Sequence, residues 1–177
     1  MKHNVVLIGF MGTGKSSTGR ALASRLGCAF VDLDQKIEQE CGMRIPEIFE
    51  THGEDFFRAK EAEAVKEAAG RRGIVISTGG GTVKNPQNME ILRQHGIVIS
   101  LIARSEVILS RTRRKGKRPV LDRMDQGDRK QAIENLMEER RALYEKADYV
   151  VDTSDWSPFQ VVEDICRYLK MRGAMHA

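Results

Sequence analysis

Cysteine and long apolar runs are both scarce in this chain. Its 177 residues include only three cysteines, Cys28, Cys41 and Cys166, and their spacing matches no common metal site. We therefore expect buried or idle thiols, as in a protein of the reducing cytoplasm. No apolar run approaches the roughly 20 residues that span a bilayer. The short run near the N-terminus is interrupted by glycines and a lysine, so neither a membrane segment nor a signal peptide is expected.

Repeats, low-complexity tracts and interdomain linkers are also missing from the sequence. The length therefore predicts one domain, residues 1–177, that can bury a substantial core. Lysine and arginine together number 29, and aspartate and glutamate 25, which leaves a formal net charge of +4. This balance suits a small polyanion as a ligand as well as it suits a nucleic acid.

One glycine-rich stretch gives the strongest signal in the chain. It follows the apolar residues 5–8, precedes a predicted helix over residues 17–26, and reads Gly9-Phe10-Met11-Gly12-Thr13-Gly14-Lys15-Ser16. This fits the pattern G-x-x-x-x-G-K-S/T of a phosphate-binding P-loop, in which glycines allow close approach and amides at a helix N-terminus bind the anion. The predicted nucleotide-binding residues are Gly12, Thr13, Gly14, Lys15, Ser16 and Ser17.

Within this P-loop two side chains have distinct predicted tasks. Lys15 is expected to reach the β- and γ-phosphates, and the Ser16 hydroxyl to hold magnesium. Lys15 is also a predicted catalytic residue, because it would stabilise charge on the transferred phosphoryl group. The alternative is a plain glycine turn between strand and helix, with Lys15 solvated.

Two aspartates, Asp32 and Asp34, close the next apolar run at residues 28–31. A continuous apolar run is typical of a strand covered on both faces, and residues i and i+2 share one side of an extended chain. We therefore expect both carboxylates to face one site, one serving a metal and the other an acceptor hydroxyl. The alternative is a helix N-cap with a solvated neighbour.

A triple glycine, Gly79-Gly80-Gly81, follows another apolar run at residues 74–77. Consecutive glycines are costly unless something must approach the backbone closely, so a ligand-binding loop is favoured over a flexible turn.

Further along, residues 111–119 are dense in positive charge and lie between two predicted helices, about 105–111 and 128–147. They predict a mobile cationic lid, about residues 112–124, over nucleotide phosphates. The alternative is a solvated or nucleic-acid-binding surface.

The remaining patterns complete an α/β alternation. Further strands are predicted at residues 97–101 and 149–152, and further helices at 35–41, 44–70 with a break at Gly53, 86–94 and from Pro158 to about residue 169. Such alternation predicts a three-layer fold with a central parallel sheet of about five strands flanked by helices. Because ligands bind at the carboxyl ends of parallel strands, the P-loop, the two aspartates and the triple glycine should meet at one edge. The helical excursion, about residues 33–61, is the predicted substrate-binding segment.

Several motifs in this order resemble those of the shikimate kinases, within the nucleoside monophosphate kinase-like P-loop fold. Besides the P-loop they are Val31-Asp32-Leu33-Asp34, Phe57-Arg58, Ser77-Thr78-Gly79-Gly80-Gly81, Arg118-Pro119-Val120-Leu121 and Glu139-Arg140-Arg141-Ala142-Leu143-Tyr144. The similarity runs from residue 5 to about residue 169. It implies that ATP phosphorylates the 3-hydroxyl of shikimate, giving ADP and 3-phosphoshikimate on the route to chorismate and aromatic amino acids.

The resemblance also assigns roles on the substrate side. Asp34 would hold the shikimate hydroxyls and is the candidate base, and Arg58 and Arg140 would clamp the carboxylate, which an arginine fork binds bidentately. The triple glycine would line the substrate, with the Gly80 amide touching it. Arg140 rather than Arg141 takes the clamp role, because Leu143-Tyr144 anchors the alignment.

On the nucleotide side, the resemblance implies ATP and Mg2+ as cofactors. Ser16 would bind magnesium directly and Asp32 through water. The catalytic Arg118 would close with the lid onto ATP, although other basic lid residues compete for that role. Arg111 and the region of Pro158 would flank adenine.

The competing hypotheses are another small-molecule P-loop kinase of the gluconate type and, from a different class, a nucleic-acid-associated ATPase. The first should lack the pairing of Asp34 with Arg58 and the triple glycine. A GTPase switch would need an N-K-x-D-type guanine reader, which the sequence does not contain. The expected partners are therefore shikimate and ATP, without nucleic acid or membrane, and the expected state is a cytoplasmic monomer.

Overall fold

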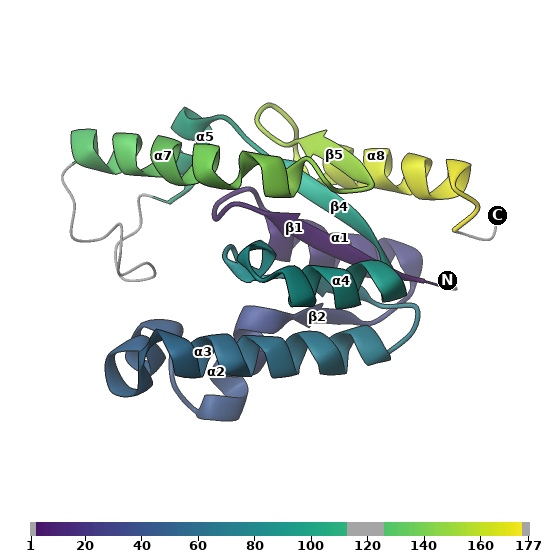
Figure 1. Ribbon diagram of the computed structural model, residues 1–177. Coiled ribbons are helices and arrows are strands. Elements are labelled where there is room, and N and C mark those ends of the chain that lie inside the picture. The colour runs from purple at the N-terminus through teal and green to yellow at the C-terminus, as the bar shows by residue number, and fades with distance from the viewer. Residues whose placement is uncertain (1–2, 113–125, 175–177) are drawn as a thin grey trace.

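A five-stranded sheet lies at the centre of the computed structural model, which describes residues 3–112 and 126–174. The strand order is β2-β3-β1-β4-β5, and all neighbouring pairs are parallel (Figure 1). The strands are β1 Asn4–Gly9, β2 Phe30–Asp32, β3 Val75–Ser77, β4 Gly96–Ile102 and β5 Tyr149–Asp152. The predicted parallel sheet of about five strands is confirmed.

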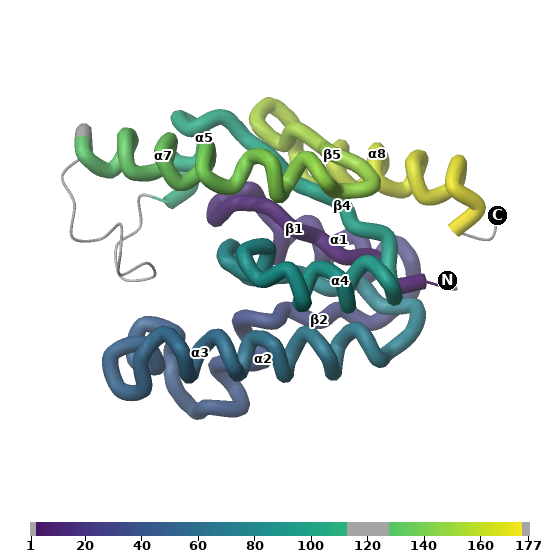
Figure 2. Tube along the Cα trace, viewed as in Figure 1, coloured from purple at the N-terminus to yellow at the C-terminus, as the bar shows by residue number. Residues whose placement is uncertain are grey.

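Helices cover both faces of this sheet and give the predicted three layers (Figure 2). On one face α1 packs against α8, and on the other α3 lies beside α4, and α5 beside α7. The helices are α1 Lys15–Leu26, α2 Leu33–Cys41, α3 Ile45–Gly70, α4 Pro86–His95, α5 Ser105–Arg111, α7 Gln126–Tyr144 and α8 Pro158–Met171, with a short 3-10 helix, η1, at Thr82–Lys84.

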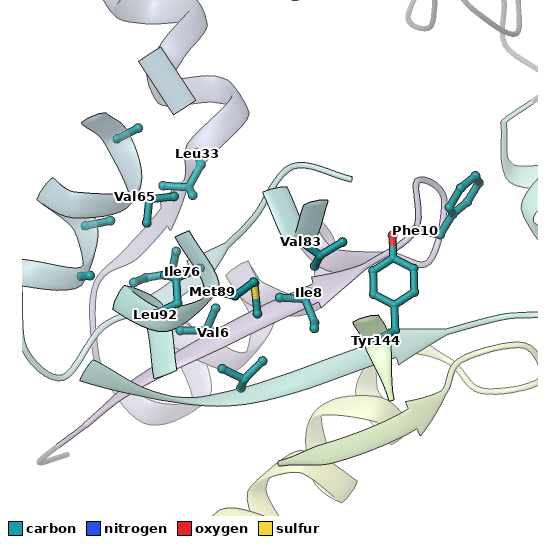
Figure 3. Close-up of a cluster of buried hydrophobic side chains, with 14 of the residues drawn as sticks. Val6, Ile8, Phe10, Leu33, Val65, Ile76, Val83, Met89, Leu92 and Tyr144 are labelled. Carbon is teal, nitrogen blue, oxygen red and sulfur yellow. The ribbon is translucent and has the colours of Figure 1, made fainter. Parts of the chain in front are cut away.

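The central strand β1 supplies both hydrophobic cores because its side chains alternate between the two faces. Val5 and Leu7 belong to the cluster with α1 and α8, whereas Val6 and Ile8 belong to the cluster with α3 and α4. Figure 3 shows the second cluster, from β1 across to Leu92 on α4. Every residue of β1 is buried, as expected for the middle strand of a sheet covered on both faces.

The chain between β2 and β3 differs in part from the sequence prediction. The predicted break at Gly53 is confirmed, because this residue has φ 83° and ψ 172° inside α3. The strand predicted at 28–31 lies at Phe30–Asp32, however, and α2 begins at Leu33 instead of residue 35. The physical reason is Asp32, whose Oδ1 accepts a hydrogen bond from the Gln35 amide at 3.2 Å and starts the helix early.

Two further predictions concern the lid and membrane-spanning helices. The predicted lid, about residues 112–124, lies outside the described residues except for Thr112. Among the helices that are described, none combines the length and apolar character needed to cross a bilayer.

Candidate active site

The P-loop leaves β1 at Gly9 and enters α1 through two glycines in left-handed conformations. Gly12 has φ 78° and Gly14, the N-cap residue of α1, has φ 91°. Side chains rarely adopt such angles, and a Cβ on Gly12 would also lie 2.8 Å from Cγ2 of Thr112. The turn therefore requires glycine at these positions, and it brings the loop to the N-terminus of α1, where a helix favours anions.

Lys15 bends back over the loop that precedes it. Its Nζ donates hydrogen bonds to the carbonyls of Gly9 at 2.7 Å and Phe10 at 2.9 Å, and the residue is only 8% exposed. The alternative of a solvated Lys15 is therefore wrong. The ammonium group is held against the first two residues of the P-loop.

Ser16 and Asp32 face each other across the site. The Ser16 hydroxyl donates to Oδ2 of Asp32 at 2.5 Å, and Asp32 is buried. A hydroxyl and a carboxylate are oxygen ligands of the kind that Mg2+ prefers, usually alongside waters and substrate phosphates. Across residues 3–112 and 126–174, no group of three or more His, Cys, Asp and Glu side chains forms a denser metal site. The Ser16–Asp32 pair thus fits a phosphate-bound magnesium ion.

Asp34 lies in the first turn of α2, so the prediction that Asp32 and Asp34 share one side of an extended strand is wrong. Asp32 is a helix N-cap, as in the alternative, but Asp34 is not a solvated neighbour: it is largely buried and close enough to Asp32 to feel its charge. Burial raises the pKa of Asp34 to about 6, and repulsion from Asp32, Glu61 and Glu38 adds to the effect. The nearby Lys15 ammonium lowers this pKa and so opposes part of the shift.

The triple glycine follows β3 and touches the charged side chains of the site. A Cβ on Gly79 would lie 2.7 Å from Oδ1 of Asp34, and one on Gly81 would lie 2.8 Å from both terminal nitrogens of Arg58. None of the three glycines has a positive φ. Close approach of a carboxylate and a guanidinium group, and not backbone conformation, is therefore the reason for glycine here.

Arg140 reaches the same loop from α7. Its Nη1 donates to the Gly80 carbonyl at 2.8 Å, and its guanidinium lies 5.6 Å from the centre of the Phe10 ring in the P-loop. Tyr144, one helical turn later, also donates to the Gly80 carbonyl, at 3.2 Å. Arg141 points elsewhere and forms a surface ion pair with Glu138 at 2.7 Å. Of the two neighbouring arginines, Arg140 is the one at the triple glycine.

Arg58 is held by two glutamates of its own helix. Nη1 donates to Glu61 at 2.9 Å, and Nη2 lies 3.3 Å from Glu54. Ion pairing with nearby glutamates is the ordinary role of an arginine on a helix surface. Glu61, however, is only 1% exposed and also accepts a hydrogen bond from Thr82 at 2.7 Å. Sequence reasoning missed Glu61, although its i,i+3 spacing from Arg58 was a usable signal.

On the other side of the P-loop lies Arg111. Its Nη1 donates to the Gly12 carbonyl at 3.3 Å, and its Nη2 to the Thr153 carbonyl at 2.8 Å. Pro158 is exposed at the start of α8, five residues after Thr153. Ser17 is also exposed, and its hydroxyl lies 3.1 Å from the Gly14 carbonyl. Arg118 lies outside the described residues.

The P-loop, Asp34, Arg58 and Arg140 therefore gather around the triple glycine at the carboxyl edge of the sheet. A sequence profile described as shikimate kinase matches residues 11–170. The chain belongs to the shikimate kinase family. Members of this family from Pelotomaculum thermopropionicum and Caldanaerobacter subterraneus are 46% and 44% identical to it. The matches cover 94% and 96% of this chain, and 95% and 98% of the relatives.

Solved structures agree with this family assignment. A shikimate kinase from Acinetobacter baumannii, in complex with shikimate, superposes with a TM-score of 0.91 and 36% identity, covering 96% of this chain and 94% of that one. A gluconokinase from Sinorhizobium meliloti has a TM-score of 0.60 at 19% identity, which shows a shared fold alone. The predicted family, fold class and kinase activity are confirmed, and the gluconate-type alternative is only a distant structural neighbour.

Proposed function

We propose that this kinase transfers the γ-phosphoryl group of ATP to the 3-hydroxyl of shikimate, giving ADP and 3-phosphoshikimate for chorismate and aromatic amino acid synthesis. The observation that supports this best is the meeting of Asp34, Arg58 and Arg140 around the triple glycine, next to the P-loop. A carboxylate with two guanidinium groups suits a substrate that carries both hydroxyls and a carboxylate.

The two arginines bind the substrate carboxylate in this proposal. Arg58 is pre-oriented by Glu61, so little side-chain entropy is lost when substrate binds. Nε of Arg140 is buried and lacks a hydrogen-bond partner among the described residues. A buried donor of this kind is satisfied when an acceptor such as a carboxylate arrives. The Gly79 carbonyl accepts a hydrogen bond from the Thr82 amide at 3.3 Å. Because C=O and N–H of one trans peptide point in opposite directions, the Gly80 amide points away from Thr82, and in this proposal it contacts the substrate.

Asp34 positions the reacting hydroxyl. Its pKa of about 6 leaves the carboxyl group mostly ionised at neutral pH and able to accept the hydroxyl proton. Lys15, whose ammonium group is close enough to lower the pKa of Asp34, neutralises phosphate charge. In phosphoryl transfer such positioning and charge stabilisation supply most of the catalysis.

The nucleotide lies along the P-loop, from Gly12 to Ser17, with Arg111 and Pro158 beside adenine. Ser16 would hold Mg2+ directly and Asp32 through water, and the bound ion would neutralise phosphate charge. We further propose one catalytic domain over residues 1–177 that acts as a cytoplasmic monomer without nucleic acid or membrane partners. The roles of Arg118 and of the lid fall outside the described residues and stay predictions.

The test is a coupled assay of ADP release with shikimate, quinate, gluconate and nucleoside monophosphates as acceptors. Shikimate should be turned over and the other acceptors far more slowly. Asp34→Asn should abolish transfer while ADP binding persists, because only the acceptor loses its partner. Near-normal turnover by that variant would remove Asp34 from the mechanism, and preference for gluconate or a nucleotide acceptor would refute the proposed substrate.

A further inference from the structure

Thr153 joins three segments that are far apart in the sequence. It follows β5 directly and is only 2% exposed. Its hydroxyl oxygen lies 3.0 Å from the Thr13 carbonyl in the P-loop and 3.1 Å from the Ile102 carbonyl at the end of β4. Nη1 of Arg111, from α5, donates to the same oxygen at 3.2 Å.

The hydroxyl of Thr153 has one proton to donate, and two carbonyl oxygens lie within reach of it. The Ile102 carbonyl already accepts from the Thr153 backbone amide at 2.8 Å. The Thr13 carbonyl can therefore take the hydroxyl proton, while the hydroxyl lone pairs accept from Arg111. Arg111 in turn donates to the Gly12 carbonyl, so two consecutive carbonyls of the P-loop are held from the β5 side.

Holding these carbonyls fixes the amides that a phosphate would meet. A trans peptide is planar, with its C=O and N–H pointing in opposite directions. The Thr13 carbonyl points to Thr153, so the amide of Gly14 points away from Thr153, and in the proposed nucleotide site it faces the phosphate. Gly14 has φ 91° and no side chain to restrain it, so an outside contact is needed to set this peptide.

We infer that Thr153 is a positioning residue for nucleotide binding, acting through the P-loop peptide between Thr13 and Gly14 and through the guanidinium of Arg111. It touches neither phosphate nor adenine itself. One hydroxyl aligns the phosphate-binding amides and the arginine proposed to lie beside adenine, so it couples the two ends of the nucleotide site. This inference rests on the proposed nucleotide site.

Three substitutions separate the hydroxyl from the methyl group of Thr153. Thr153→Val keeps the shape and removes the hydroxyl, Thr153→Ser keeps the hydroxyl, and Thr153→Ala removes both. The valine and alanine variants should raise the dissociation constant for ADP and the KM for ATP by roughly 5- to 30-fold, as expected for loss of a hydrogen-bond network of this size. The KM for shikimate should stay within about twofold, and the serine variant should bind ADP within about twofold of wild type.

ADP binding is measured by calorimetry, both KM values by the coupled assay, and folding by urea unfolding. Ser154→Ala is the matched control. The hydroxyl oxygen of Ser154 accepts a hydrogen bond from the Arg104 amide at 2.9 Å, which is not a contact with the P-loop or with Arg111. If Thr153→Val does not fold, Thr153→Ala carries the same test.

Three outcomes decide the inference. Selective weakening of ADP and ATP binding with rescue by serine supports it. Wild-type ADP affinity in the valine variant, or equal loss in the serine variant, would overturn it and leave the proposed function intact. Failure of the wild-type protein to bind ADP would instead overturn the proposed nucleotide site and this inference together.

Discussion

Replacing Asp34 with asparagine should stabilise the ligand-free protein near pH 8 and have little effect near pH 4. The carboxyl group of Asp34 is desolvated, and Asp32, Glu61 and Glu38 repel its negative charge. The Lys15 ammonium opposes these effects without cancelling them, so the folded state disfavours the ionised form. Asparagine keeps the shape of the side chain and carries no charge at any pH, so it removes this cost.

The size of the effect follows from the pKa. A rise from 3.8 to about 6 is roughly two pK units, and at about 1.4 kcal/mol per unit it costs about 3 kcal/mol when Asp34 is ionised in both states. Between these two pKa values the folded state binds more protons than the unfolded state, so stability falls as pH rises. The destabilisation is therefore absent below about pH 3.8, grows up to about pH 6 and is constant above it.

Urea unfolding of wild type and Asp34→Asn, at several pH values from about 4 to 8, measures this difference. The free energy of unfolding of the variant, minus that of wild type, should rise by about 3 kcal/mol between the lowest and the highest of these pH values. Asp55→Asn, which removes an exposed carboxyl group from α3, controls for the change in net charge. A constant difference between Asp34→Asn and wild type at all pH values would refute the reasoning, as would a variant that is less stable near pH 8.

Three further substitutions test the substrate and metal sides of the site. Arg58→Lys should raise the KM for shikimate roughly tenfold with kcat less affected, because lysine cannot replace a bidentate guanidinium; an unchanged KM in the folded variant would argue against the clamp. Gly81→Ala should have a similar effect on KM, because its Cβ would lie 2.8 Å from two nitrogens of Arg58, whereas Gly70→Ala, with nothing within 4 Å, is the control. Ser16→Ala should lower kcat by roughly 10- to 100-fold and raise the Mg2+ concentration needed for half-maximal rate, since one oxygen ligand is lost. A magnesium titration that superposes on that of wild type would exclude Ser16 as a ligand.

Local pattern was sufficient where neighbours in the sequence are neighbours in space. The P-loop, its strand and its helix are one continuous segment, so spacing alone predicted the strand, the glycine turn and the helix that follows. The break at Gly53 was predicted for the same reason. The apolar runs also predicted the strands of a parallel sheet, because strands buried on both faces carry few polar residues.

Prediction failed where the chain changes conformation within a few residues. The run at 28–31 continues into Asp32-Leu33-Asp34, and periodicity could not show that the helix begins at Leu33. Its start depends on the Asp32 side chain, whose two oxygens bind the Gln35 amide and the Ser16 hydroxyl. One of those partners lies 16 residues away and is invisible to any local pattern.

The sequence by itself determined the fold class, the P-loop and, through motifs in order, the family. Only the tertiary structure decided that Arg140 meets Gly80, that Glu61 is buried against Arg58, and that Thr153 reaches the P-loop. These contacts join residues on different elements, and they depend on how strands are ordered and helices packed. Burial and long-range electrostatics, which set the pKa of Asp34, exist only after the chain has folded.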